Sequence, residues 1–296
     1  MRHFLDVDDL TAGELTEVLD LAERRDPPAV LGGRGAALLF EKPSNRTRVS
    51  MEMAVVQLGG HPVTLRPDEI GLDTREPVED VARALSQYCA VIGARVFDHR
   101  SVVRLAEAAS VPVVNLLSDQ SHPCQALADL LTLRQHWASL AGRTMAWVGD
   151  GNNVCRSLLL AGALARMRLR VATPAGYEPP LEILERTGAH LSSDPAEAVE
   201  GADAVSTDVW ASMGQEDEVA ERTRAFAGFT VDHDLMARAR PGALFLHCLP
   251  AHRGDEVTAS VVDGPSSVVW QQAANRMHAQ RGLLLWLAGA ATPPAS

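Results

Sequence analysis

Short apolar runs alternate with amphipathic stretches of helical length along most of the chain. An apolar run of roughly four to eight residues is typical of a buried strand, whereas apolar residues at i, i+4 and i+7 mark one face of a helix. We expect strands at Ala36–Phe40, Val63–Leu65, Ala90–Ile92, Val111–Asn115, Met145–Gly149, Arg170–Thr173, Ala204–Asp208 and Leu244–His247. We expect helices at Pro77–Gln87, Ser101–Ala109, Pro123–His136 and Gln272–Leu287, and another where Val49, Met53 and Val56 recur at helical spacing. This alternation predicts an α/β fold with mostly parallel sheets and helices on both faces.

The alternation pauses after the helix at Pro123–His136 and restarts at Met145. A chain of 296 residues, 46% of them hydrophobic, also fits two domains better than one. We therefore expect two doubly wound parallel-sheet domains, residues 1–135 and 136–271, joined by interdomain helices. The last amphipathic stretch, within residues 272–296, is long enough to cross back and pack on the first domain.

The balance of charge points away from nucleic acids. The chain has 27 Lys and Arg against 38 Asp and Glu, a net charge of −11, whereas nucleic-acid-binding domains are usually basic. Its longest apolar runs fall well short of the roughly 20 residues of a membrane helix, and acidic residues stand near the start, where a signal peptide would be apolar. Scattered cysteines without a C-x-x-C pair are typical of free thiols in a reducing compartment (Cys89, Cys124, Cys155 and Cys248). We expect a cytoplasmic protein that binds neither nucleic acid nor membrane.

The first cluster of candidate functional residues, Phe40–Arg48, lies where a predicted strand ends and a helix begins. Ligands collect at this place in open α/β sheets, and the free N–H groups of a helix start attract anions. Ser44 and Thr47 add two hydroxyls, and Arg46 and Arg48 add two guanidiniums. The alternative is a helix that is capped by Ser44 and keeps its arginines in solvent. Arginine in a first turn opposes the helix dipole unless an anion compensates it, which favours a phosphate site.

A second cluster, Ser121–Gln125, also opens a helix after a strand. His122 and Gln125 could polarise a carbonyl group and hold an amino group there, although a histidine that only caps the helix is an equal alternative. In the second half, Gly149 and Gly151 resemble the start of a dinucleotide fingerprint. Val154 stands in place of its third glycine, so a nucleotide site is not expected.

Two further clusters end predicted strands of the second half. Asp208 follows an apolar strand and could hold a cationic group, with Ser212, Met213 and a glycine beyond it. The sequence His-Cys-Leu-Pro begins at His247, and the spacing His-Cys-x3-His suggests zinc. Side chains of adjacent strand residues alternate between faces, which disfavours a shared metal ion. A cysteine nucleophile is conceivable, but a thiol that lines a substrate site is the interpretation we favour for Cys248.

Together these clusters resemble the carbamoyltransferase (transcarbamoylase) family, over nearly the whole chain from Phe4 to about Trp286. S-x-R-T-R at 44–48 and H-P-x-Q at 122–125 resemble the family's carbamoyl phosphate motifs. D-x-x-x-S-M-G at 208–214 and H-C-L-P at 247–250 resemble the versions found in members that act on ornithine. The resemblance implies transfer of the carbamoyl group from carbamoyl phosphate to the δ-amine of L-ornithine, giving L-citrulline and phosphate in arginine metabolism.

The resemblance also implies a role for individual positions. Carbamoyl phosphate is expected to contact Ser44, Asn45, Arg46, Thr47, Arg95, His122, Gln125, Cys248, Leu249 and Arg276. Ornithine is expected to contact Asn153, Asp208, Ser212 and Met213. The residues expected to be catalytic are Arg46, Arg95, His122 and Cys248. No metal and no organic cofactor are expected, and the family implies a homotrimer, or a multiple of trimers, with sites between subunits.

Two positions depart from the family pattern. Asn45 stands where the family usually has threonine, but asparagine still offers hydrogen-bond donors, so we expect phosphate binding to survive. Many members carry a glutamine in the loop that reaches a neighbouring subunit's site, and His61–Asp80 contains none. Whether the loop Asp68–Glu76 contributes to a neighbouring subunit's site is therefore left open.

Other functions compete with this one. A sibling enzyme could act on aspartate, putrescine or an acylated ornithine, although Asp208 suits a diamino acid better than a dicarboxylic one. An inactive relative could bind ornithine or carbamoyl phosphate as a sensor, and a nicotinamide dehydrogenase rests only on the broken glycine pattern. Whether the reaction runs in the biosynthetic or the catabolic direction is not fixed by the sequence.

Overall fold

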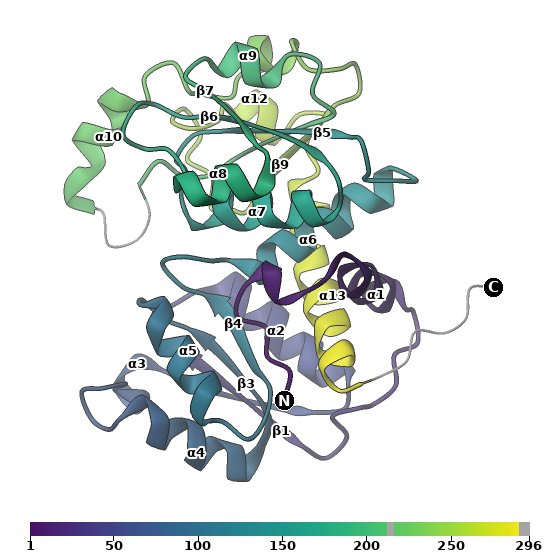
Figure 1. Ribbon diagram of the computed structural model, residues 1–296, viewed down its shortest axis with the longest axis vertical. Helices are drawn as coiled ribbons and strands as arrows, with labels where there is room; N and C mark the ends of the chain where they lie inside the picture. Colours follow the sequence, from purple (N-terminus) through teal and green to yellow (C-terminus); the bar gives the residue numbers. More distant parts are fainter. Residues whose placement is uncertain (212–215, 290–296) are drawn as a thin grey trace. The chain divides into compact units, whose positions relative to one another are not determined.

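The structure is a computed structural model that describes residues 1–211 and 216–289 (Figure 1). The chain forms two compact units: the first consists of Met1–Leu131 and the segment from Ala274 onward, and the second of Thr132–Ala273. The chain passes between the units inside two helices, α6 (Pro123–His136) and α13 (Val269–Leu287). Each unit contains a parallel sheet with helices on both faces, which confirms the predicted fold class.

The sheet of the first unit has four parallel strands in the order β2-β1-β3-β4. All four were predicted, with ends that differ by up to three residues. Because the strands are parallel, their carboxyl ends lie at one edge of the sheet, and the residues that follow them gather there. The strands are β1 (Gly35–Phe40), β2 (His61–Leu65), β3 (Cys89–Arg95) and β4 (Val113–Leu117).

The sheet of the second unit has five parallel strands in the order β7-β6-β5-β8-β9. Four were predicted, and β7 was not. That strand has three residues at the sheet edge, two of them exposed, and so leaves no apolar run in the sequence. The strands are β5 (Thr144–Val148), β6 (Arg168–Ala172), β7 (His190–Ser192), β8 (Ala204–Thr207) and β9 (Leu244–His247).

Helices cover both faces of each sheet (Figure 1). In the first unit, α4 (Val78–Tyr88) and α5 (His99–Ala108) pack on one face, and α1 (Ala12–Glu23), α2 (Asn45–Gln57) and α13 lie on the other. In the second unit, α7 (Asn153–Leu164) and α8 (Leu181–Thr187) cover one face, and α9 (Pro195–Val199) lies on the other. Shorter helices are η1 (Val7–Asp9), α3 (Pro67–Ile70), η2 (Glu216–Glu218), α10 (Val219–Ala225), α11 (His233–Met236) and α12 (Ala259–Val262).

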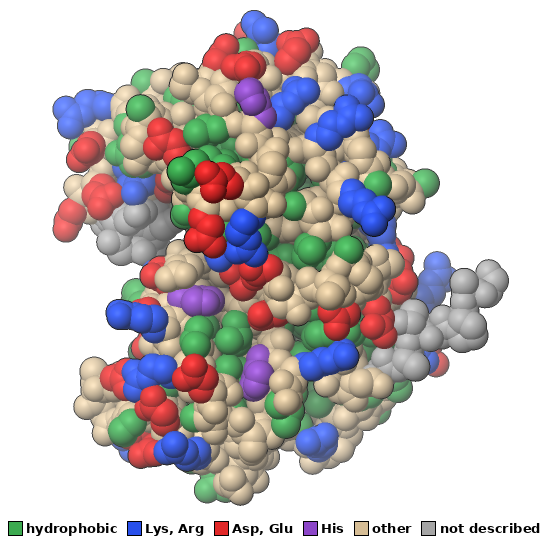
Figure 2. Space-filling model, viewed as in Figure 1, with side chains coloured by type: hydrophobic (Ala, Val, Ile, Leu, Met, Phe, Trp, Pro, Cys, Tyr) green, Lys and Arg blue, Asp and Glu red, His purple; other side chains and the backbone are tan. Residues whose placement is uncertain are grey.

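The surface carries acidic and basic side chains mixed together on the face drawn in Figure 2. Within residues 1–211 and 216–289, every helix is too short or too polar to cross a lipid bilayer.

The apolar residues whose spacing predicted helix α2 lie on its exposed face. Val49, Met53 and Val56, whose recurrence predicted the helix, are 56%, 42% and 49% exposed. The residues that α2 buries are instead Thr47, Met51, Ala54 and Val55. The spacing therefore predicted the helix, but the sheet lies against a different face, and an apolar stripe is left on the surface.

Helix α13 is held in the first unit by close packing against α1. Its Gly282 approaches the α1 backbone so closely that a Cβ atom there would lie 2.5 Å from the carbonyl oxygen of Val18. One helical position earlier, the guanidinium of Arg281 donates hydrogen bonds to the carbonyl oxygens of Ala22 and Arg24, at 2.9 and 2.7 Å. These contacts join the last long helix of the chain to α1 of the first unit.

This close approach makes a direct prediction for stability. Gly282→Ala should destabilise the protein by about 1–3 kcal/mol, because the added methyl group forces the two helices apart. Gly13→Ala in α1 is the control, since a Cβ there meets only the Thr11 hydroxyl at 4.0 Å, and alanine is the better helix former by up to ~1 kcal/mol. Thermal unfolding of both variants checks this. Equal melting temperatures for Gly282→Ala and the wild type would contradict the packing.

Candidate functional site

The first predicted anion site lies at the start of α2, directly after β1. Ser44 is the N-cap of this helix, and its hydroxyl accepts the backbone N–H of Thr47 at 3.3 Å. The side chain of Asn45 accepts the N–H of Arg46 at 2.8 Å. The residue that departs from the family pattern, Asn45, therefore uses its side-chain oxygen to accept a backbone N–H of the first turn of α2.

The hydroxyl of Thr47 joins two buried guanidinium groups. Arg95, the last residue of β3, donates to Thr47 Oγ1 at 3.3 Å, and Arg276 of α13 donates to the same oxygen at 3.1 Å. Arg276 also donates to the side-chain oxygen of Gln125 and lies 3.2 Å from Nε2 of His122. The side chains that meet at one edge of the first unit are therefore those of Ser44, Thr47, Arg95, His122, Gln125 and Arg276. Asn45 and Arg46 adjoin this group in the sequence.

His122 is neutral in this arrangement. A guanidinium can only donate hydrogen bonds, so Nε2 of His122, which faces Arg276, carries no proton. Burial lowers the pKa of His122 well below its ordinary value, and the positive charges of Arg276 and Arg95 lower it further. A neutral imidazole beside two cations can polarise a carbonyl group and leaves the positive charge free for an anion.

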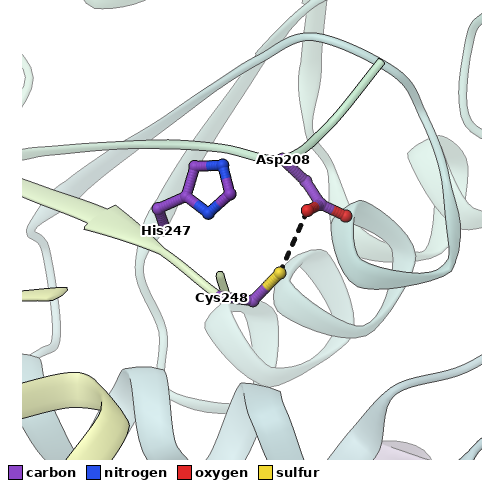
Figure 3. A group of neighbouring side chains, drawn as sticks. All are labelled: Asp208, His247 and Cys248. Atoms are coloured by element: carbon purple, nitrogen blue, oxygen red, sulfur yellow. Dashed lines mark hydrogen bonds between the residues drawn. The ribbon is translucent and has the colours of Figure 1, made fainter. Parts of the chain in front are cut away.

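The second predicted site lies in the second unit, at the carboxyl ends of β8 and β9 (Figure 3). The thiol of Cys248 donates to Asp208 Oδ1 at 3.0 Å, and the amide of Asn152 donates to Asp208 Oδ2 at 2.9 Å. Asp208 is 5% exposed, so its charge is largely withdrawn from solvent. Such a carboxylate gains from a cationic partner, and the cationic ligand expected at Asp208 stays a prediction.

His247 fixes the backbone beside Cys248. Its Nδ1 accepts the N–H of Leu249 at 2.8 Å, so the proton of the neutral ring is on Nε2, which lies 3.1 Å from Oε1 of the buried Glu256. Leu249 has a φ of 62°, a left-handed conformation that is rare for leucine. The hydrogen bond from its N–H to His247 holds this turn in place.

Potential metal ligands do lie together at this edge. Ligand atoms of Asp208, His247 and Cys248 are within 4.8 Å of one another, as are those of His252, Asp255 and Glu256. Strand β9 ends at His247 and Cys248 lies beyond it, so the alternation of side chains along a strand does not keep these two residues on opposite faces. Both ring nitrogens of His247 face partners within the protein, however, and the arrangement is a hydrogen-bond network that does not need an ion.

Most of these residues were predicted from the sequence, whereas Asn152 and Glu256 were not. Of the other predicted ornithine contacts, Asn153 is the first residue of α7. Ser212 and Met213 lie outside the described residues. The missed residues are Asn152, which caps α7 and binds Asp208, and Glu256. The N-cap position of Asn152 after β5 was a usable signal, whereas nothing in the sequence pairs Glu256 with His247.

The loop Asp68–Glu76 is tied to its own unit. Arg104 of α5 donates from both ends of its guanidinium to Asp73, at 2.6 and 3.0 Å, and to Glu79, at 2.6 and 2.8 Å. The bonds from Arg104 lower the pKa of Glu79 to about 2. The bonds to Asp73 thus join the loop to α5 of the first unit.

Two family models match the chain, both described as aspartate/ornithine carbamoyltransferase. The carbamoyl-P binding domain matches residues 2–135, and the Asp/Orn binding domain matches residues 141–287. Together they span nearly the whole chain.

Individual relatives agree with these models. An ornithine carbamoyltransferase from Acidothermus cellulolyticus is 54% identical over 98% of this chain and 98% of its own length. The crystal structure of the Thermus thermophilus ornithine carbamoyltransferase is 49% identical, covers 97% of this chain and 99% of its own, and superposes with a TM-score of 0.91. The ornithine carbamoyltransferase structure from Pyrococcus furiosus gives 45% identity, 98% coverage of both chains and a TM-score of 0.93.

The protonation state of His122 can be measured directly. We expect its imidazole to stay neutral from pH 8 down to pH 6, because its folded pKa lies well below the roughly 6.5 of a free histidine. For the same reason, as the pH falls, His122 takes up a proton in the unfolded chain at a higher pH than in the folded chain. His122 therefore reduces the free energy of unfolding as the pH falls through 6.5. Nitrogen NMR shifts, with His122→Gln to assign the resonance, check this. An imidazole of His122 that titrates near pH 6.5 would contradict the burial.

Proposed function

Since this chain belongs to the aspartate/ornithine carbamoyltransferase family, we propose that it transfers the carbamoyl group of carbamoyl phosphate to the δ-amine of L-ornithine and releases L-citrulline and phosphate. The observation that carries this proposal is the meeting of Arg95 and Arg276 at the Thr47 hydroxyl. Two buried guanidiniums at a helix N-terminus favour a compact anion with several acceptor oxygens, such as phosphate.

The residues of the first unit take the roles of a carbamoyl phosphate site. Ser44, Asn45, Arg46 and Thr47 bind the phosphate together with Arg95. His122, Gln125 and Arg276 act on the carbamoyl group, His122 and Arg276 toward its carbonyl oxygen and Gln125 toward its amino group. Cys248 and Leu249, at the end of β9, line the point of attack.

The reaction then follows from the charges. The neutral δ-amine forms a bond to the carbonyl carbon, negative charge builds on the carbonyl oxygen, and the carbon–oxygen bond to phosphate breaks as phosphate leaves. The amine loses one proton in the process, and the departing phosphate takes it up. Donors aimed at an oxygen that becomes negative are usually the largest catalytic contribution, and losing one costs about 3–4 kcal/mol of barrier. No step requires a metal ion or an organic cofactor.

Asp208 supports ornithine over the sibling substrates. Its shielded carboxylate fits the α-ammonium of ornithine, with Asn153, Ser212 and Met213 as further contacts. Aspartate would bring a second carboxylate toward this negative site, putrescine has no α-carboxylate, and an acylated ornithine has lost the cation. An inactive sensor would have no need for His122, Arg276 and Cys248 together.

The proposal extends to assembly and location. We propose a homotrimer, as the family resemblance implies, in which copies bury the stripe Val49, Met53 and Val56 of α2 and the half-exposed Val63 of the edge strand β2. Contiguous apolar patches of this kind commonly mark interfaces. We also propose that the protein acts in the cytoplasm, where its four free cysteines would stay reduced.

The activity is tested by colorimetric citrulline formation. The protein should form citrulline from carbamoyl phosphate and ornithine, and no carbamoylated product from aspartate or putrescine. Asp208→Asn should raise the KM for ornithine roughly 10–100-fold, because a hydrogen bond to a charged group contributes about 1.5–3 kcal/mol, and should leave the KM for carbamoyl phosphate unchanged.

Asp263→Asn is the matched control, since Asp263 forms an exposed ion pair with Arg253 in the same unit. It should leave both KM values unchanged. Product formed from aspartate or putrescine but not from ornithine would overturn the proposed substrate, and a parallel rise of both KM values in Asp208→Asn would overturn its assignment to ornithine.

Light scattering tests the assembly. The wild type should have three times the 31.7 kDa mass of one chain, and Met53→Lys should dissociate it, because a buried lysine without a partner is costly. Leu181→Lys in α8, where the leucine is 69% exposed in the second unit, is the control and should keep the mass. A wild type that is monomeric and fully active would contradict the trimer.

A further inference from the structure

Arg222 of α10 is a buried arginine that the proposed chemistry does not use. Its side chain is 9% exposed. Nη1 donates to Oδ2 of Asp150 at 2.9 Å and to the carbonyl oxygen of Trp210 at 2.8 Å, and Nε donates to Glu218 at 2.8 Å. One guanidinium therefore joins three segments: the turn after β5, the chain after β8, and the chain before α10.

The surroundings hold this guanidinium in one place. Its carbon Cζ lies 5.0 Å from the centre of the Tyr177 ring, in a cation–π contact. Phe226 packs against Tyr177 at 4.8 Å and stacks with Trp210 at 5.6 Å between ring centres. Trp147 donates from its indole to the carbonyl oxygen of Asp150 at 2.9 Å, which fixes the other side of the pair. An ion pair packed this tightly has little freedom to move.

The three partners of Arg222 surround the predicted ornithine contacts in the sequence. Trp210 follows Asp208 by two residues, and Asp150 precedes Asn152, which donates to Asp208, by two. Trp210 and Glu218 also stand on either side of Ser212 and Met213, the other residues proposed for ornithine. A shift of Arg222 would thus be passed to Asp208 from two directions.

We propose that Arg222 is a positioning residue for ornithine binding, which holds the backbone on both sides of Asp208 through Asp150 and Trp210. The proposal rests on the proposed function. Arg222 touches no substrate, and it acts by setting where the Asp208 carboxylate lies.

The choice of arginine over lysine follows from the geometry. Three acceptors in different directions need a planar fork of N–H donors, whereas lysine offers one compact charge on a flexible stem. Burial raises the pKa of Asp150 to about 6, with Arg222 opposing this and Asp208 and Glu218 adding to it. At neutral pH the Asp150 carboxylate is ionised, so loss of the guanidinium leaves a buried charge unbalanced and the turn free to move.

The test compares three variants in the citrulline assay at pH 8. Arg222→Gln should raise the KM for ornithine about 10-fold or more, which corresponds to about 1.4 kcal/mol, with the KM for carbamoyl phosphate unchanged. Arg222→Lys should recover part of this loss, because it restores the charge but not the fork. Glu218→Gln, which breaks only the outer and half-exposed contact, should have a smaller effect on the same constant.

Arg143→Gln is the matched structural control. Arg143 pairs at 2.9 Å with the buried Asp203 at the opposite, amino end of β5, so its loss should lower the melting temperature and leave both KM values unchanged. If Arg222→Gln does not fold, Arg222→Lys and Glu218→Gln decide the question. An unchanged ornithine KM in the folded Arg222 variants, or a parallel rise for carbamoyl phosphate, would overturn the positioning role. A wild type that forms no citrulline would instead overturn the proposed function itself.

Discussion

The meeting of two buried guanidiniums at one threonine hydroxyl constrains much of the first unit. Arg95 reaches Thr47 because it ends β3, the strand next to β1, and Thr47 lies in the first turn after β1. Arg276 reaches it only because α13 returns from the second unit and packs against α1 at Gly282. Withdrawing positive charge from water is costly unless an anion or strong acceptors compensate it. The fold of the first unit therefore assembles, from three distant parts of the chain, a position that favours phosphate.

The second unit places a negative charge, the Asp208 carboxylate, at the carboxyl edge of its parallel sheet. Asp208 ends up shielded at the carboxyl edge of a parallel sheet, where Asn152 and Cys248 orient its two oxygens. The net charge of −11 does not weaken the anion site of the first unit, because salt screens charges beyond about 8 Å. In the proposed function, the first unit binds an anion and the second a cation, and the reaction needs both substrates.

The sequence was sufficient where the signal is local or carried by the motif resemblance. The apolar runs predicted all strands of both sheets except β7, whose three residues are too few and too exposed to make a pattern. The residues around Thr47 were found because a strand end, a helix start and a family motif coincide there. The stripe of Val49, Met53 and Val56 predicted the helix but not which face would be exposed, because that depends on how α2 packs on the sheet. Arg222 and Glu256 were missed because their partners, Asp150 and His247, are distant or lie across a turn, and a charged residue in a sequence does not reveal its burial.

The central claim is that the anion is bound by the first unit and the amino acid by the second. Hydrogen exchange followed by mass spectrometry tests this directly, since bound ligands slow local opening of the backbone. Inorganic phosphate alone should slow exchange at the start of α2 and around His122, and ornithine added with phosphate should further slow exchange near Asn152 and Cys248. Protection of the Asn152 and Cys248 segments by phosphate alone, with the start of α2 unaffected, would contradict the account.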